Sequence, residues 1–250
     1  MKPIFIAGPC VIESTELLDI VAQELVRLNE KYSIQIIFKS SFDKANRTSI
    51  HSYRGSGLEK GLQMLADVKS KYGLQLLTDI HESYQAAPVG EVVDVIQIPA
   101  FLCRQTDLLV AAAKTGKVVN IKKAQFLSGM DMQYPVQKIK EAGNDRVWLT
   151  ERGNIYGYNN LVVDFRNIAD MKRFTDTVIM DCTHSVQRPG AAGGKTGGNR
   201  EFVPAMASAA KAFGATGFFF EVHPEPDKAL SDGPNMLYLK NLENVIASLL

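Results

Sequence analysis

The sequence predicts an α/β protein, a single-domain (β/α)8 TIM barrel spanning residues 1–250. Short apolar or β-branched runs recur about 30 residues apart, which is the size of one βα unit. Helical patterns lie between these runs, and such alternation is typical of a parallel sheet covered by helices. Eight runs in 250 residues fit a closed barrel better than an open sheet. No Pro/Ser-rich linker divides the chain, so we expect one domain.

The expected strands are short and are separated by segments with helical periodicity. The strands cover residues 4–7, 35–39, 75–78, 95–98, 118–122, 147–150, 177–181 and 217–221. Between them, apolar residues repeat at intervals of three and four, which places their side chains on one helix face. The clearest stripes are Leu18, Val21, Leu25 and Leu28; Leu58, Leu62 and Leu65; Leu108, Leu109 and Ala112; Met206, Ala209 and Phe213; and Leu242, Val245 and Leu249. Ser14 and Thr15 are the candidate caps of the first helix.

The composition excludes several other classes of protein. Lysine and arginine number 28 against 27 aspartates and glutamates. The resulting net charge of +1 argues against a protein that binds nucleic acid through a large positive charge. Three scattered cysteines are too few for a disulfide framework. No apolar stretch approaches the roughly 18 residues that a membrane span needs. We therefore expect a cytoplasmic protein with neither a nucleic acid nor a membrane as partner.

Reactive side chains of a (β/α)8 barrel lie at the carboxyl ends of its strands. Each expected strand is followed there by a polar or reactive group. Six of these groups are cations: Lys39, Lys44, Arg47, Arg104, Lys122 and Arg152. Clustered cations need compensating anions, so we expect a substrate that carries phosphate and carboxylate. Pairing with acids such as Glu151 and Asp181 is the alternative for some of them.

Four residues at the same ends are candidate metal ligands, namely Cys10, His184, Glu221 and Asp232. One sulfur, one imidazole and two carboxylates suit a divalent Zn, Fe or Mn ion. The four are scattered in the sequence, however, and a lone cysteine at a strand end is more often a packing residue. The residues alone leave the metal site open, with His81 and His223 as rival ligands.

Residues 187–200 form a glycine-rich segment after the seventh expected strand. Its Gly-Gly-Lys-Thr at 193–196 looks like the end of a P-loop, but Pro189 stands where that motif needs glycine. We therefore expect a flexible lid over the barrel mouth rather than a nucleotide site.

Five segments resemble one enzyme family. They are Ala-Gly-Pro-Cys at 7–10, Phe-Lys-Ser-Ser-Phe-Asp-Lys-Ala-Asn-Arg-Thr-Ser at 38–49, Thr-Asp-Ile-His-Glu at 78–82, Gln-Ile-Pro-Ala-Phe-Leu-Cys-Arg-Gln-Thr-Asp at 97–107 and His-Pro-Glu-Pro at 223–226. Through them, residues 3–250 resemble the 3-deoxy-D-manno-octulosonate 8-phosphate synthases. The resemblance implies a (β/α)8 enzyme that condenses phosphoenolpyruvate with D-arabinose 5-phosphate and water and releases phosphate. Such an enzyme supplies a lipopolysaccharide precursor.

The resemblance also implies roles for individual residues. Phosphoenolpyruvate would be bound by Lys39, Lys44, Gln97, Lys122 and Arg152. The sugar phosphate would be bound by Asn46, Arg47, Thr48, Asp79 and Gln187, and by Arg104 from a neighbouring subunit of a homotetramer. Lys44, His184 and Asp232 are the expected catalytic residues.

Position 10 divides this family. Metal-independent members have asparagine there and metal-dependent members have cysteine. Cys10 therefore implies the metal-dependent class, with His184, Glu221 and Asp232 as the other ligands.

Three other functions remain open at this point. The aromatic-pathway 3-deoxy-D-arabino-heptulosonate 7-phosphate synthase uses a four-carbon sugar, but it carries Lys-Pro-Arg where this chain has Lys-Ala-Asn-Arg at 44–47. A Schiff-base aldolase would use Lys122 or Lys123 as its nucleophile. A non-catalytic phosphosugar-binding barrel would bind ligand without releasing phosphate.

Overall fold

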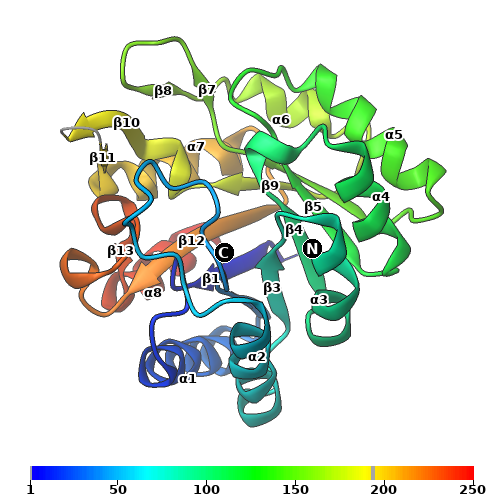
Figure 1. Ribbon diagram of the computed structural model, residues 1–250. Coiled ribbons are helices and arrows are strands. Elements are labelled where there is room, and N and C mark those ends of the chain that lie inside the picture. Colours follow the sequence, from blue (N-terminus) through cyan, green and yellow to red (C-terminus); the bar gives the residue numbers. More distant parts are fainter. Residues whose placement is uncertain (1, 193–194) are drawn as a thin grey trace.

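A closed barrel of parallel strands forms the centre of the molecule in the computed structural model, which describes residues 2–192 and 195–250 (Figure 1). Its strands follow one another around the barrel in the order β1, β2, β3, β4, β5, β6, β9 and β12, and β12 pairs in parallel with β1. They are β1 (Ile4–Gly8), β2 (Ile36–Lys39), β3 (Leu76–Asp79), β4 (Val95–Ile98), β5 (Val118–Lys122), β6 (Val147–Glu151), β9 (Val178–Asp181) and β12 (Gly217–His223). The predicted (β/α)8 barrel is confirmed.

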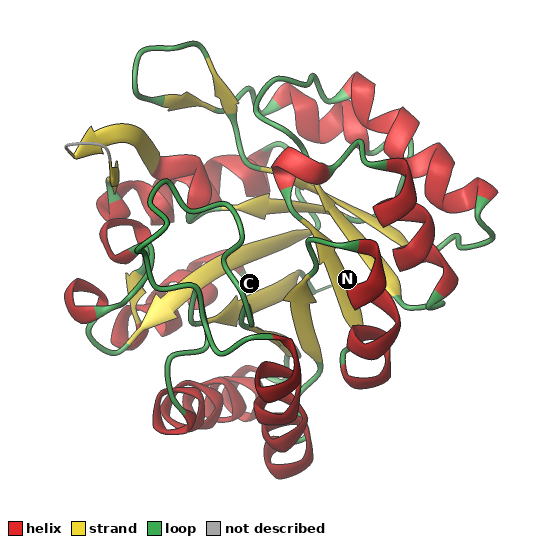
Figure 2. Ribbon diagram, viewed as in Figure 1, coloured by secondary structure: helices red, strands yellow, loops and turns green. Residues whose placement is uncertain are grey.

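Helices surround the barrel on the outside (Figure 2). They are α1 (Thr15–Tyr32), α2 (Leu58–Tyr72), α3 (Ala86–Val92), α4 (Thr106–Lys114), α5 (Gln133–Glu141), α6 (Arg166–Met171), α7 (Val203–Ala212) and α8 (Leu239–Leu249). Among the described residues, no helix has the length and apolar character needed to cross a membrane.

The barrel interior changes from apolar to charged along the strands. Its apolar cluster is Ile6, Ile37, Leu77, Val95, Ile179 and Phe219. Side chains two residues apart on a strand point to the same face, so the next inward positions after three of these are Lys39, Asp181 and Glu221. All three are buried. The charged side chains therefore lie at the carboxyl ends of the strands, next to a layer of apolar side chains that fills the rest of the barrel interior.

Helix α1 begins where the sequence predicted. Ser14 is its N-cap, and the Ser14 hydroxyl accepts a hydrogen bond from the Leu17 N–H at 3.2 Å. Helix α7 differs from the prediction, because its buried residues are Val203, Ala207 and Ala210. Phe213, which was expected to pack, follows the helix and is 49% exposed. In this alanine-rich helix, two neighbouring stripes both have apolar residues at intervals of three and four. The stripe with Ala207 and Ala210 is the buried one.

Two hairpins extend from the barrel on the same side in Figure 1. One joins β7 (Asn154–Ile155) to β8 (Leu161–Val162), and the other joins β10 (Gln187–Ala192) to β11 (Lys195–Gly198). The expected lid at 187–200 is thus a hairpin, of which residues 193–194 lie outside the described part, and its mobility stays a prediction. A short strand, β13 (Leu237–Tyr238), also pairs with the end of β12.

Candidate active site at the carboxyl end of the barrel

A cavity of about 940 Å³ opens at the carboxyl ends of the strands. It brings together most of the residues that the sequence singled out. The predicted residues in its lining are Lys39, Lys44, Asn46, Arg47, Thr48, Asp79, Gln97, Lys122, Arg152, His184, Gln187 and Asp232. Cys10 and Glu221 do not line it but are buried close to its floor. Arg104 is exposed and lies outside the lining of its own chain's cavity.

Glu221, at the end of β12, is the acid around which the cations gather. Its Oε1 accepts a hydrogen bond from Lys39 Nζ at 2.9 Å and lies 3.9 Å from Lys44 Nζ. Burial by itself would raise the pKa of Glu221, but the surrounding cations, Lys39 above all, hold this pKa well below its usual range. Glu221 is therefore an ionised acid at neutral pH.

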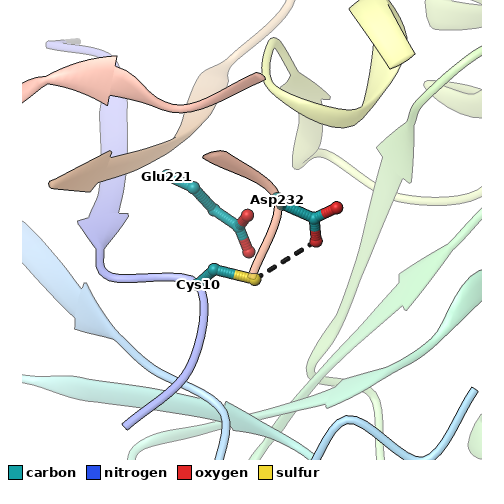
Figure 3. A group of neighbouring side chains, drawn as sticks. All are labelled: Cys10, Glu221 and Asp232. Atoms are coloured by element: carbon teal, nitrogen blue, oxygen red, sulfur yellow. Dashed lines mark hydrogen bonds between the residues drawn. The ribbon is translucent and has the colours of Figure 1, made fainter. Parts of the chain in front are cut away.

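Cys10, Glu221 and Asp232 form a compact group of possible metal ligands (Figure 3). One ligand atom from each lies within 4.8 Å of the other two. Cys10 Sγ donates to Asp232 Oδ2 at 3.2 Å and lies 2.9 Å from the hydroxyl of Ser231. Burial, followed by the charge of Glu221, raises the pKa of the Cys10 thiol far above its usual range. The Cys10 thiol is therefore protonated at neutral pH in this environment.

His184 lies beside this group, at the start of the segment after β9. Its Nε2 is 3.6 Å from Glu221 Oε2 and 4.0 Å from Asp232 Oδ2. Its Nδ1 is 2.8 Å from Asp181 Oδ2, an ionised carboxylate that can only accept, so the proton sits on Nδ1. Nε2 then faces the two acids, which is the arrangement of a metal-binding histidine whose other ring nitrogen is held by a carboxylate.

Neither rival histidine joins the group. His81 is 3.1 Å from Asp79 Oδ2, and His223 is 3.9 Å from Glu13. Among the described residues, Cys10, Glu221 and Asp232 form the one cluster of this kind.

Two further cations and an amide, Arg152, Lys122 and Gln97, line the cavity beside this group. Arg152, just after β6, is almost fully buried, and its Nη2 donates to Gln187 Oε1 at 2.8 Å. Its Nη1 is buried with no hydrogen-bond partner. Lys122 Nζ donates to Asp181 Oδ2 at 2.7 Å, and burial lowers the pKa of Lys122. Gln97 is fixed by Asn120, whose Oδ1 accepts from Gln97 Nε2 at 2.7 Å.

A long loop after β2 forms the outer wall of the cavity. Arg47 in this loop donates from Nε to the Tyr53 carbonyl at 3.2 Å, and its Nη2 is buried without a partner. Asn46 and Thr48 are exposed in the same wall. On the floor, Asp79 accepts a hydrogen bond from the Ser41 hydroxyl at 2.5 Å. The guanidinium of Arg47 thus keeps one buried N–H donor available to an anionic ligand.

Three further residues organise the site. Sequence reasoning named Asp181 only as a possible partner of a cation, and its pairing with Lys122 agrees with that alternative. Asn120 and Ser231 were assigned no role. Asp181 joins Lys122 to His184, Asn120 orients Gln97, and Ser231 contacts Cys10. Asp181 was recognisable as the last residue of a strand. Asn120 was recognisable as a polar residue inside an apolar strand, whereas Ser231 had no signal in the sequence.

Comparison with known proteins identifies the family of the chain. The family model described as the DAHP synthetase I family matches residues 1–249. The chain belongs to this family. Three curated relatives, each named 2-dehydro-3-deoxyphosphooctonate aldolase, are similar to this DAHP synthetase I family member over nearly its whole length. The relative from Cyanothece sp. is 57% identical over 98% of this chain and 90% of its own length. The relative from Fusobacterium nucleatum is 54% identical over 97% of this chain and 87% of its own length. The relative from Campylobacter jejuni is 57% identical over 100% of this chain and 96% of its own length.

Proposed function

We propose that this protein condenses phosphoenolpyruvate with D-arabinose 5-phosphate and water to give 3-deoxy-D-manno-octulosonate 8-phosphate and phosphate, a step in lipopolysaccharide precursor biosynthesis. The observation that carries the proposal is the name shared by relatives that are 54–57% identical over almost the whole chain. The name 2-dehydro-3-deoxyphosphooctonate aldolase denotes the same enzyme as 3-deoxy-8-phosphooctulonate synthase. The aromatic-pathway alternative is not favoured by these relatives.

Phosphoenolpyruvate occupies the side of the cavity formed by Lys39, Lys44, Gln97, Lys122 and Arg152. The unpartnered Nη1 of Arg152 supports this placement, since a buried guanidinium nitrogen without a partner is costly unless a ligand accepts its hydrogen bond. Lysines contribute point charges, and the arginine fork suits a phosphate or a carboxylate. Together they offset the repulsion between the charged groups of the two substrates.

Arabinose 5-phosphate extends along the outer wall. Arg47 binds its phosphate through the unpartnered Nη2, while Asn46 and Thr48 reach the sugar hydroxyls. Asp79 and Gln187 complete this side. The two phosphates thus lie apart, and the enol carbon meets the aldehyde between them.

The reaction forms a bond from the enol carbon to the aldehyde, and water then adds to the cationic carbon that remains before phosphate leaves. We place Lys44, His184 and Asp232 next to these reacting atoms. Lys44 is held as a protonated ammonium near Glu221 and balances developing negative charge. His184 keeps its proton on Nδ1 towards Asp181 and presents Nε2 to the reaction side.

A divalent Zn, Fe or Mn ion fits the residues Cys10, His184, Glu221 and Asp232. The buried Oε2 of Glu221 has no hydrogen-bond partner, and the sulfur, imidazole and carboxylates form a donor set that such ions prefer. When bound, the ion would orient or polarise the aldehyde or position the water.

Two further parts of the proposal concern the assembly and the compartment. We propose a homotetramer in which Arg104 enters a neighbour's cavity, because Arg104 is exposed and does not line its own. We also propose that the enzyme works in the cytoplasm.

A Schiff-base aldolase would require a free lysine in the cavity. Lys123 is completely buried and does not line the cavity. Lys122 does line it, but its ammonium is paired with Asp181 at 2.7 Å. Trapping with borohydride in the presence of substrate separates the two mechanisms, because the proposed reaction forms no imine.

Phosphate release with phosphoenolpyruvate and either sugar tests the proposed function. We expect rapid release with arabinose 5-phosphate and poor release with erythrose 4-phosphate. The reason is Asn46, since a site that hydrogen-bonds a hydroxyl rejects an analogue lacking it by orders of magnitude. Equal turnover of both sugars, or none with either, would contradict the proposal.

A further inference from the structure

Lys123 is a buried cation that the proposed mechanism does not use. Its side chain is completely inaccessible, and it does not line the cavity, so it cannot touch a substrate there. A charge buried this deeply is costly unless its surroundings compensate it. The structure supplies that compensation at the junction of β5 and β6.

The ammonium of Lys123 is surrounded by oxygen atoms. Its three N–H groups are shared among four acceptors within hydrogen-bond distance: Asn154 Oδ1 at 3.0 Å, the Leu127 carbonyl at 3.1 Å, and the Gly153 and Ala124 carbonyls at 3.3 Å each. It also lies 3.4 Å from Oε1 of Glu151, which is itself completely buried. Glu151 supplies the opposite charge.

Lys123 and Glu151 together hold the backbone on both sides of Arg152. Glu151 Oε1 accepts from the Arg152 N–H at 2.9 Å and from the Gly153 N–H at 2.6 Å. Lys123 donates to the carbonyl of Gly153 and to the side chain of Asn154. Gly153 has a φ of +92°, so the chain turns sharply here in a conformation that other residues rarely adopt.

We propose that Lys123 is a positioning residue that fixes the Glu151–Asn154 corner and thereby aims the guanidinium of Arg152 at the acidic groups of phosphoenolpyruvate. Stability alone does not explain the Lys123–Glu151 ion pair, because apolar residues of similar volume at such buried positions often make a protein at least as stable. This inference rests on the proposed function, since it assumes that Arg152 binds phosphoenolpyruvate.

Isothermal titration with phosphoenolpyruvate, using the full chain, tests the inference. Lys123→Met should raise the Kd for phosphoenolpyruvate about tenfold or more, because a displaced binding group loses much of its effect. The KM for arabinose 5-phosphate should stay unchanged. Lys69→Met is the control. Lys69 also binds a backbone carbonyl and a carboxylate, that of Asp94, but it does not line the cavity. Its loss should leave the Kd for phosphoenolpyruvate and the KM for arabinose 5-phosphate unchanged.

Two further variants cover the case in which Lys123→Met does not fold. The double variant Lys123→Met/Glu151→Gln leaves no unpaired buried charge and keeps an amide oxygen for the Arg152 and Gly153 N–H groups. Asn154→Ala removes the side-chain acceptor of Lys123 and the two hydrogen bonds from Asn154 Nδ2 to the Gln125 and Leu127 carbonyls, but it keeps both buried charges. It should shift the Kd in the same direction but less.

The outcomes separate this inference from the proposed function. The controls are that wild-type protein binds phosphoenolpyruvate and that Arg152→Ala does not. If these hold and a folded Lys123 variant binds phosphoenolpyruvate with the wild-type Kd, the inference is overturned, whether or not the Tm of the variant is lowered. Wild-type protein that fails to bind phosphoenolpyruvate overturns the proposed function, and this inference with it.

Discussion

Single residues of the site owe their state to neighbours from distant parts of the chain. Glu221 illustrates this, because its ionised form depends on Lys39 from β2, Lys44 from the following loop and Lys122 from β5. Removing any one cation changes the charge that the others must balance. Substitutions at the cavity wall, where fewer groups are coupled, are therefore easier to interpret.

Arg47→Ala tests the outer wall. The variant should raise the KM for arabinose 5-phosphate more than that for phosphoenolpyruvate, because a lost charge-assisted phosphate contact costs roughly 1.5–3 kcal/mol. Steady-state kinetics with each substrate varied measures the difference. Arg54→Ala is a matched control in the same loop, since Arg54 pairs with Asp43 and does not line the cavity. An unchanged sugar KM in Arg47→Ala would show that Arg47 points elsewhere.

Asp79 predicts part of the acid sensitivity of the fold. Burial alone would raise its pKa, but the hydrogen bond and charge of His81, followed by Lys39, hold the pKa of Asp79 well below its ordinary value of 3.8. A carboxyl group whose pKa is lower in the folded than in the unfolded protein stabilises the folded state. This stabilisation is complete above the pKa of the unfolded state and is lost as the pH falls towards the pKa of the folded state. The free energy of unfolding should therefore decline below about pH 4.

The Asp79→Asn variant isolates this contribution. Because an amide does not titrate, the variant should be less stable near neutral pH and should lose less stability on acidification. Denaturant unfolding at a series of pH values measures both slopes. Parallel curves for the variant and the wild type would exclude Asp79 as a source of the acid loss.

The sequence correctly predicted that residues following different strands meet at one cavity, while their roles stay predictions. Lys39, Lys122 and Arg152 come directly at or after strand ends, and a barrel gathers such positions at one rim. Ser231 was missed because its contact with Cys10 depends on the path of an irregular segment after β12. Periodicity carries no information about such a path.

At the scale of elements, the close approach of β1 and β2 places Cys10 and Lys39 together. Lys39 Nζ donates to the Cys10 carbonyl at 3.0 Å. Gly8 makes the approach possible, because a Cβ at this position would lie 1.9 Å from the Lys39 carbonyl oxygen. Backbone atoms, unlike the end of a flexible side chain, cannot move aside separately.

Gly8→Ala should therefore displace the end of β1 from β2. We expect a loss of about 1–3 kcal/mol in the free energy of unfolding, as for other overpacked sites. Phosphate release should fall more than this loss of stability implies, since Lys39 and Cys10 shift with the strands. Denaturant unfolding and the release assay measure the two effects. A variant with wild-type stability and rate would show that the strands can separate without cost.

Strands were predicted more accurately than the outer elements. The barrel strands are apolar on both faces, so each stands out as a continuous run between polar segments. The β7–β8 hairpin and β13 have strands of two residues, too short for any periodic signal. Helix α7 was placed correctly, but its buried face was wrong because alanines give little contrast between neighbouring stripes.

At the scale of the whole molecule, closure of the barrel brings the possible metal ligands Cys10, Glu221 and Asp232 together. Gly8 of β1 lies in register with Glu221 of β12, although they are more than two hundred positions apart. The sequence allowed this neighbourhood to be predicted, because strand eight of a closed barrel adjoins strand one. A bound ion would therefore link the first strand to the last third of the chain.

Metal removal should consequently affect both stability and activity. Chelation should abolish phosphate release and lower Tm, because a ligand present at 100 times its Kd adds about 2.7 kcal/mol to the folded state. Added Mn²⁺, Fe²⁺ or Zn²⁺ should restore both, and Cys10→Ser should bind these ions more weakly since a neutral hydroxyl is a poor ligand. Cys10→Asn, the residue of the metal-independent class, should make Tm insensitive to chelation and keep some activity without metal. Stripped wild-type protein, checked by elemental analysis, with full activity and an unchanged Tm would show that Cys10 only packs against Ser231 and Asp232.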